Sequence, residues 1–223
     1  MNENRQYETF FELASSMRAM RRLKPDPVPP SVLNKILEAG VQAPSGQNTQ
    51  PWSFLVLQQP NSKAWFAERY KAAIESRFTG MMSMSTEKDT ALTRQVKAMQ
   101  YQVNHMQEFP VILIVCGLRD WPFKVAEADR IGLAPPNFGA VYPCVQNILL
   151  ACRSLNLGAA LTTMHQVFEE ALCEHFAIPD EYGVVVTILL AIQWGNSAQY
   201  AGSLRQTKRI MKHGADTSLS AEI

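Results

Sequence analysis

The sequence lacks a strong net charge. Its 223 residues carry 21 lysines and arginines against 20 aspartates and glutamates, a formal charge of +1 at pH 7. Proteins that bind nucleic acid or anionic membrane surfaces depend on a strong positive field, which this balance does not provide. The composition therefore predicts no nucleic-acid partner and makes any anion site a local one.

Long apolar runs and paired cysteines are also missing. No stretch reaches the ~20 apolar residues that a membrane-spanning helix needs, and the polar start has no apolar signal core. The four cysteines show no C-x-x-C spacing, and most lie in apolar runs where a reduced thiol packs well. These absences predict a soluble, cytoplasmic protein with no membrane partner.

Several motifs of catalysis and cofactor binding are absent as well. The sequence has no glycine pattern for dinucleotides or triphosphates, no serine in G-x-S-x-G, and no histidines at metal-ligand spacing. It therefore predicts no metal site and no side-chain nucleophile. An enzyme with this sequence would rely on a bound cofactor for its chemistry.

The residues that are present predict one α+β domain over residues 1–223. They are 47% hydrophobic, enough for a core without metal or disulfides, and no linker or repeat divides them.

Ser62 is expected to cap the third helix and residues 86–89 the fourth. Strand 184–192 is too long and apolar for a sheet edge. Apolar spacing predicts helices from residue 7 to about 24 and at 30–43, 62–73, 86–106, 142–155 and 168–176, and strands at 54–57, 111–116, 159–163 and 184–192, an order typical of a sandwich with one sheet.

Two arginine-bearing segments are candidates for binding a phosphate. The arginine segment, residues 18–22, is Arg18-Ala19-Met20-Arg21-Arg22 and lies at the end of the first predicted helix or just past it. Guanidinium groups bind phosphate through bidentate hydrogen bonds and keep their charge. Arg205, in the polar tail, would complete such a site. By itself the cluster is also typical of a solvated helix end.

Two other segments carry groups suited to an aromatic, amide-rich ligand. In the Pro-Ser-Gly loop, residues 44–51, Gly46 lets the backbone approach a ligand, and the side chains of Ser45 and Asn48 offer hydrogen bonds. An ordinary tight loop has the same composition. Thr162, Thr163 and Met164 end a short predicted strand, where N–H groups and hydroxyls could face a ring edge, although threonine is also simply a good strand residue.

Taken together, these segments resemble the nitroreductase family of FMN proteins over nearly the whole chain. The shared motifs are R-A-M-R-R-L-K-P-D-P-V-P, A-P-S-G-Q-N-T-Q-P-W-S-F and Y-P-C-V-Q-N-I-L-L-A-C-R-S-L-N-L-G, followed by the tail arginine. The second motif is the most specific. The family usually has R-S-x-R where this chain has Arg18-Ala19-Met20-Arg21, so Ala19 replaces a serine, and Leu23 stands where the family tends to have phenylalanine.

The resemblance implies a mostly antiparallel sheet flanked by helices in an intertwined homodimer, with FMN at the subunit interface. Residues 79–106 would form a variable cover over the substrate, and residues 196–223 a C-terminal arm. Arg18, Arg21 and Arg205 would hold the FMN phosphate, with Ala19 and Met20 lying between the first two. Pro44, Ser45 and Gly46 would lie against the flavin from the second subunit, and Asn48 would stabilise the loop or contact the ring. Thr162, Thr163 and Met164 would pass near the flavin N5 edge.

The implied activity is ping-pong reduction of nitroaromatics, quinones or similar electron-poor small molecules, with NAD(P)H as co-substrate. Three alternatives stay open: a flavin-fragmenting enzyme of vitamin B12 ligand synthesis, a reductive dehalogenase of the iodotyrosine type, and a non-catalytic FMN carrier or sensor. The dehalogenase grips its amino acid with Glu, Tyr and Lys. Glu68, Tyr70 and Lys71 lie nearby here but form no convincing equivalent of that set, which disfavours an amino-acid substrate.

Overall fold

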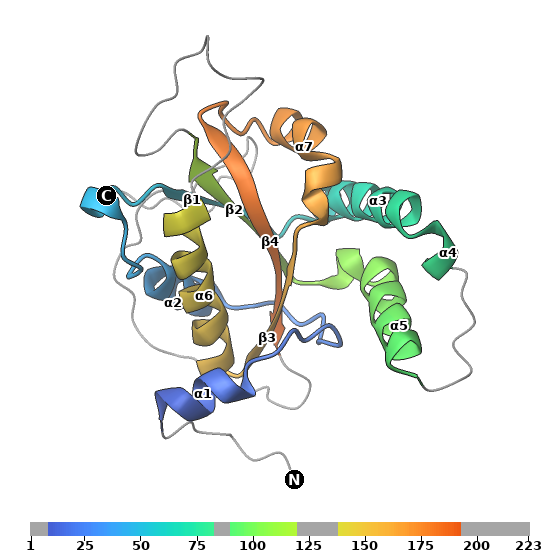
Figure 1. Ribbon diagram of the computed structural model, residues 1–223, viewed down its shortest axis with the longest axis horizontal. Coiled ribbons are helices and arrows are strands. Elements are labelled where there is room, and N and C mark those ends of the chain that lie inside the picture. Colours follow the sequence, from blue (N-terminus) through green and yellow to red (C-terminus); the bar gives the residue numbers. More distant parts are fainter. Residues whose placement is uncertain (1–8, 83–89, 120–137, 193–223) are drawn as a thin grey trace.

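One antiparallel sheet organises the molecule. The computed structural model describes residues 9–82, 90–119 and 138–192 (Figure 1). The strands are β1 (Trp52–Leu57), β2 (Val111–Leu118), β3 (Leu157–Thr162) and β4 (Tyr182–Ile192), in the order β1-β2-β4-β3. Every pairing among them is antiparallel. β4 lies between β2 and β3, which confirms that this long apolar strand is not at an edge.

The alternating side chains of the sheet build two apolar cores. In β1 the side chain of Phe54 joins one core, whereas Leu55 and Leu57 join the other. The first core packs the sheet against α2 (Pro30–Gly40) and α6 (Phe138–Ser154). The second packs it mainly against α3 (Pro60–Arg77), α5 (Ala91–Asn104) and α7 (Glu169–His175). Because helices cover both faces, the expected α+β sandwich is confirmed (Figure 1).

The helix ends correct three sequence-based expectations. α1 (Phe10–Ser16) stops well before residue 24, because Met17 already has an extended backbone. α3 begins at Pro60, whose fixed φ suits a first turn, and Ser62 does not cap it. α5 begins after Thr90, whose hydroxyl accepts a hydrogen bond from the N–H of Thr93. In return, the N–H of Thr90 donates to the hydroxyl of Thr93. The capping box expected at residues 86–89 lies outside the described residues.

Shorter elements complete the described chain. α4 (Thr79–Met82) follows α3, and single 3₁₀ turns cover η1 (Gly46–Asn48), η2 (Met106–Glu108) and η4 (Met164–Val167). α1 has no buried residue, and Phe10 and Phe11 on it are 63% and 82% exposed. The described residues of a single chain therefore do not bury the apolar side chains of α1. None of the described helices has both the length and the apolarity to span a membrane.

Candidate functional site

A basic cleft of about 380 Å³ lies between the arginine segment and α5. Among the described residues that line it, five are cationic and none is acidic. Cations gathered on adjacent elements attract an anion, because opposite charges at short distance lower the electrostatic free energy. The lining residues are Arg18, Ala19, Met20, Arg21 and Arg22 from the segment, and Arg94, Lys97, Ala98 and Tyr101 from α5.

The arginine segment is bonded to the sheet rather than carried by a helix. The N–H of Met20 donates to the carbonyl of Ala159 in β3 at 2.9 Å, and that of Lys24 donates to Ile192 in β4 at 3.1 Å. Between them, Leu23 is buried over Gly158, where an added Cβ would clash with Leu23 Cδ2. The missing side chain at position 158 thus allows the segment to lie close against β3.

A buried hydrogen-bond chain connects the arginine segment to the end of β3. Arg21 Nε donates to Gln102 Oε1 at 2.7 Å, and Gln102 Nε2 donates to the Tyr70 hydroxyl at 2.7 Å. That hydroxyl lies 3.4 Å from Thr162 Oγ1. Gln102 and Tyr70 are only 4% and 3% exposed, so these bonds satisfy polar groups that water does not reach. Burial raises the pKa of Tyr70, although the bond to Thr162 and the nearby Arg21 charge oppose the shift, so its hydroxyl stays protonated.

The segment from Thr162 to Met164 leaves the sheet beside this chain of bonds. Thr162 is buried, Thr163 is exposed and Met164 is half-buried. The Met164 N–H donates to Thr162 Oγ1 at 3.4 Å, a long bond that the segment makes to itself. Thr163 is thus the member of the three that is open to a ligand.

The Pro-Ser-Gly loop lies at the other edge of the sheet. It leads into β1, and the carbonyl of Pro51 accepts from Leu118 at the far end of β2. β2 and β4 lie between β1 and β3, so the loop and the arginine segment are well apart within one chain (Figure 1). The structure therefore brings Arg18, Ala19, Met20 and Arg21 together and links them to Thr162, but it does not bring Pro44, Ser45, Gly46 or Asn48 to them. Arg205 lies outside the described residues.

The loop holds its own shape through short-range bonds. Ser45 Oγ accepts from the Gln50 N–H at 2.9 Å, and Gln50 Nε2 donates to Asn48 Oδ1 at 3.2 Å. Gln47, Asn48 and Gln50 all have positive φ, between 48° and 55°, a strained conformation for residues with side chains. A Cβ added to Gly46 would meet nothing within 4 Å. Strain and open space at one exposed loop are typical of a surface shaped for a ligand or a partner.

Sequence reasoning missed Arg94, Lys97, Gln102 and the bonding role of Tyr70. Arg94, Lys97 and Tyr101 follow one another at helical spacing, so they share a face of α5. Their spacing was visible in the sequence, but the sequence did not show that this face of α5 lies opposite the arginine segment. Gln102 gave no signal, because it bonds to a residue 81 positions away.

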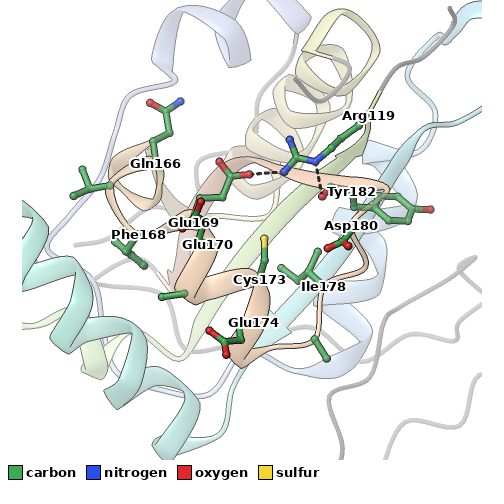
Figure 2. Close-up of a pocket in the computed structure, with 13 residues that line it drawn as sticks. Arg119, Gln166, Phe168, Glu169, Glu170, Cys173, Glu174, Ile178, Asp180 and Tyr182 are labelled. Carbon is green, nitrogen blue, oxygen red and sulfur yellow. Dashed lines mark hydrogen bonds and ion pairs between the residues drawn. The ribbon is translucent and has the colours of Figure 1, made fainter. Parts of the chain in front are cut away.

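A second, larger cleft, of about 1040 Å³, lies beside α7 and contains none of the motif residues (Figure 2). Figure 2 shows Arg119 between the Glu169 carboxylate, at 3.1 Å, and the Tyr182 carbonyl. Glu169 also accepts from the Val184 N–H at 3.0 Å. Arg119, the one arginine among the described residues that line this second cleft, is thus paired with an acid. The second cleft is therefore a poorer phosphate site than the basic cleft.

The fold and the basic cleft define an α+β protein with a local cluster of cationic side chains. Comparison with known proteins assigns it further: the chain belongs to the nitroreductase family, whose pattern it matches over residues 14–192. The expected family and fold are therefore confirmed.

Curated relatives match only in part. Iodotyrosine deiodinase 1 of Rattus norvegicus is 39% identical over 56 residues, which cover 25% of this chain and 20% of that protein. NADH dehydrogenase of Thermus thermophilus is 46% identical over 50 residues, covering 22% and 24%. The chain thus aligns with about a fifth to a quarter of the length of these relatives.

Solved structures match over most of the chain. An iodotyrosine deiodinase bound to FMN and 3-iodo-L-tyrosine has a TM-score of 0.65 at 18% identity, covering 91% of this chain and 100% of that one. The FMN-dependent nitroreductase NfnB of Mycobacterium smegmatis, in complex with NADPH, has a TM-score of 0.58 at 16% identity, covering 89% and 97%. At these identities the likeness establishes the fold alone.

Proposed function

We propose that the protein is an FMN-dependent oxidoreductase that works as a homodimer and uses NAD(P)H to reduce nitroaromatics, quinones or similar electron-poor small molecules. The observation that carries this proposal is the basic cleft. It lies at Arg18 and Arg21, the positions where the family motif holds a flavin phosphate, and its described lining contains no acid. The FMN-bound and NADPH-bound neighbours in the family support the same assignment.

The residues of the cleft fit a phosphate monoester. Such a group carries a charge of about −1.5 to −2 at pH 7 and three acceptor oxygens. Arg21 uses only its Nε for Gln102, which leaves the two terminal nitrogens for a bidentate contact. Gln102 fixes the plane of that guanidinium, and Arg18 adds a second charge. Ala19, which replaces the usual serine, removes one neutral hydrogen bond worth about 1 kcal/mol, a loss that two arginines offset.

When bound, FMN supplies the electron-transfer chemistry, and the chain supplies position and charge. Arg18 and Arg21 would anchor the phosphate, which fixes where the ring can lie. Thr162, Thr163 and Met164 would then border the ring, and the exposed Thr163 is the member best placed to contact it. No side-chain proton donor is assigned, because the buried Tyr70 is held by Gln102.

The position of the Pro-Ser-Gly loop supports a homodimer with shared sites. Pro44, Ser45, Gly46 and Asn48 lie at the opposite sheet edge from the arginines of their own chain. They could border the same flavin only if a second subunit supplied them. The exposed phenylalanines of α1 support the same conclusion, because a partner surface would bury them.

The position of α5 supports the expected cover. This helix, within residues 79–106, forms one wall of the basic cleft. A wall of the proposed phosphate cleft would lie beside the bound cofactor, which supports the proposal that this segment covers the site.

The deiodinase alternative has less support in the described residues. The proposed amino-acid grip would need Glu68, Tyr70 and Lys71 to converge, but Tyr70 is buried while the other two are exposed. Glu68 lies 3.8 Å from Arg69, and Lys71 lies 3.9 Å from Glu75. A substrate without an amino-acid zwitterion fits this arrangement better.

The test is the visible spectrum of the purified protein, followed anaerobically by NADPH or NADH and then by a quinone. The proposal expects a yellow protein that bleaches with a reduced coenzyme and regains its colour with the quinone. A flavin that stays oxidised would favour the carrier or a specialised relative. A colourless protein that refuses added FMN would refute the proposal.

A further inference from the structure

Arg21 differs from the other two arginines of the arginine segment. Arg18 and Arg22 are exposed, whereas Arg21 is half-buried. Arg21 Nε donates at 2.7 Å to Oε1 of Gln102, a side chain that is only 4% exposed. Arg21 also lines the basic cleft. One guanidinium of the cleft is thus held by a buried amide from another element.

The donors and acceptors around Gln102 allow one orientation of its amide. An arginine Nε–H can only donate, so the amide oxygen of Gln102 must face Arg21. The amide nitrogen therefore faces the Tyr70 hydroxyl at 2.7 Å, which accepts and can donate its own hydrogen to Thr162 Oγ1. A flipped amide would place two donors against each other at Arg21. Because Gln102 and Tyr70 are buried, water does not replace a lost partner, and Gln102 is fixed from both sides.

The fixed amide of Gln102 determines the direction of the Arg21 guanidinium. The five N–H groups of a guanidinium lie in one plane in a rigid fork, so a bond at Nε also orients the two terminal nitrogens. A phosphate gains most from a bidentate contact with both of them. A flexible arginine loses side-chain freedom when it binds a ligand, whereas a restrained one has lost it already on folding. Arg21 is therefore prepared for a phosphate at the cost of Gln102.

We propose that Gln102 is a positioning residue that makes the site selective for a phosphorylated flavin, FMN, over riboflavin, because it orients Arg21 toward the phosphate. Riboflavin has the same ring and ribityl chain but no phosphate, so it gains nothing from an oriented Arg21. This inference rests on the proposed function for the identity of the ligand. It deepens that function with a residue of α5 that belongs to none of the motif segments.

The binding test compares the affinities for FMN and for riboflavin, measured by flavin fluorescence on the whole chain after bound flavin is removed. Gln102→Leu removes the bonds to Arg21 and Tyr70. The ratio of FMN affinity to riboflavin affinity is expected to fall about tenfold, the effect of a side chain that must be ordered on binding. Gln107→Leu makes the same change at an exposed position of η2 and should keep the ratio of the wild type.

Gln102→Glu is a second variant that keeps the shape of the side chain, in case Gln102→Leu does not fold. Its carboxylate still accepts from Arg21 Nε, and the Tyr70 hydroxyl can donate to it instead of accepting. The added negative charge competes with the phosphate for the guanidinium. The affinity for FMN is therefore expected to fall while that for riboflavin stays the same.

A double variant tests whether Gln102 acts through Arg21. Adding Gln102→Leu to Arg21→Ala should weaken FMN binding no further than Arg21→Ala alone, because no guanidinium is left to orient. A further, independent loss in the double variant would overturn the inference. An equal loss for both flavins in Gln102→Leu, which would indicate general packing, would overturn it as well.

The same measurements separate this inference from the proposed function. If both Gln102 variants keep the ratio of the wild type while FMN is still reduced by NAD(P)H and reoxidised by a quinone, the inference fails and the proposed function stands. If the ratio falls as expected but neither coenzyme reduces the bound FMN, the proposed function fails and the role of Gln102 stands.

Discussion

The arginine segment and the Pro-Ser-Gly loop carry the two most informative motifs, yet they differ in how they are bonded to the rest of the chain. The arginine segment is tied to distant parts of its own chain, by backbone bonds to Ala159 and Ile192 and by the side chain of Gln102. The loop is stabilised mainly by bonds among its own residues and has exposed, strained backbone. In the proposed shared site, the arginine segment would thus be prepared within one subunit, whereas the loop would be presented outward to a partner subunit.

The substitution with the largest expected effect tests whether the arginine segment binds FMN. Arg21→Ala should weaken FMN binding about 10- to 100-fold, because it removes a bidentate charged contact. Flavin fluorescence titration measures the affinity, and circular dichroism should show an intact fold. Arg77→Ala, which removes an exposed arginine at the end of α3, is the matched control. Full FMN affinity in Arg21→Ala would end the assignment of the segment to the phosphate.

A second change tests whether the arginine segment depends on its contact with the sheet. Gly158→Ala places a Cβ against Leu23 and should cost about 1–3 kcal/mol of unfolding free energy. Chemical denaturation measures this cost, and FMN affinity should fall with it because the segment shifts. Adding Leu23→Ala should relieve the clash, so the double variant should be less destabilised than the sum of the two single variants. Additive losses would show that the contact does not hold the segment.

A third change separates the loop from the rest of the chain. Gly46→Val adds atoms where the described chain has open space, so the thermal stability of the subunit should not change. If the loop of one subunit borders the flavin of the other, FMN affinity should nevertheless fall about tenfold, since overpacking a contact typically costs 1–3 kcal/mol. An affinity equal to that of the wild type would contradict the shared site.

The smallest effect concerns the buried chain of bonds. Tyr70→Phe should cost about 1 kcal/mol of stability at pH 7, because Gln102 loses its acceptor. Burial raises the pKa of Tyr70 in the folded protein above the ordinary value of 10.0. Above pH 10 the unfolded chain therefore loses this proton before the folded one does, and stability falls as pH rises.

Tyr70→Phe removes that contribution, so the stability difference between variant and wild type should narrow above pH 10. Denaturation curves at pH 7 and at pH 10.5 measure it. A difference that stays constant between these two values would show that Tyr70 ionises as readily in the folded chain as in the unfolded one.

Much of the fold was predictable because it depends on local patterns. The continuous apolar run at residues 111–116 predicted a buried strand, and β2 is a central one. The helix over residues 30–43 was predictable from Pro30 and the apolar spacing after it. The end of α1 was not, because no proline marks Ser16 and the segment after it is held by distant backbone bonds.

The sequence by itself determined the order of helices and strands, the family and the residue types able to bind a phosphate. Periodicity and motif spacing are short-range properties, so a linear chain displays them directly. Only the tertiary structure decided which elements meet. It placed Arg94 and Lys97 across from Arg18 and Arg21, tied Arg21 to Gln102, and separated the Pro-Ser-Gly loop from all of them. Spacing on a helix shows which residues share a face, but packing around the sheet decides what that face meets.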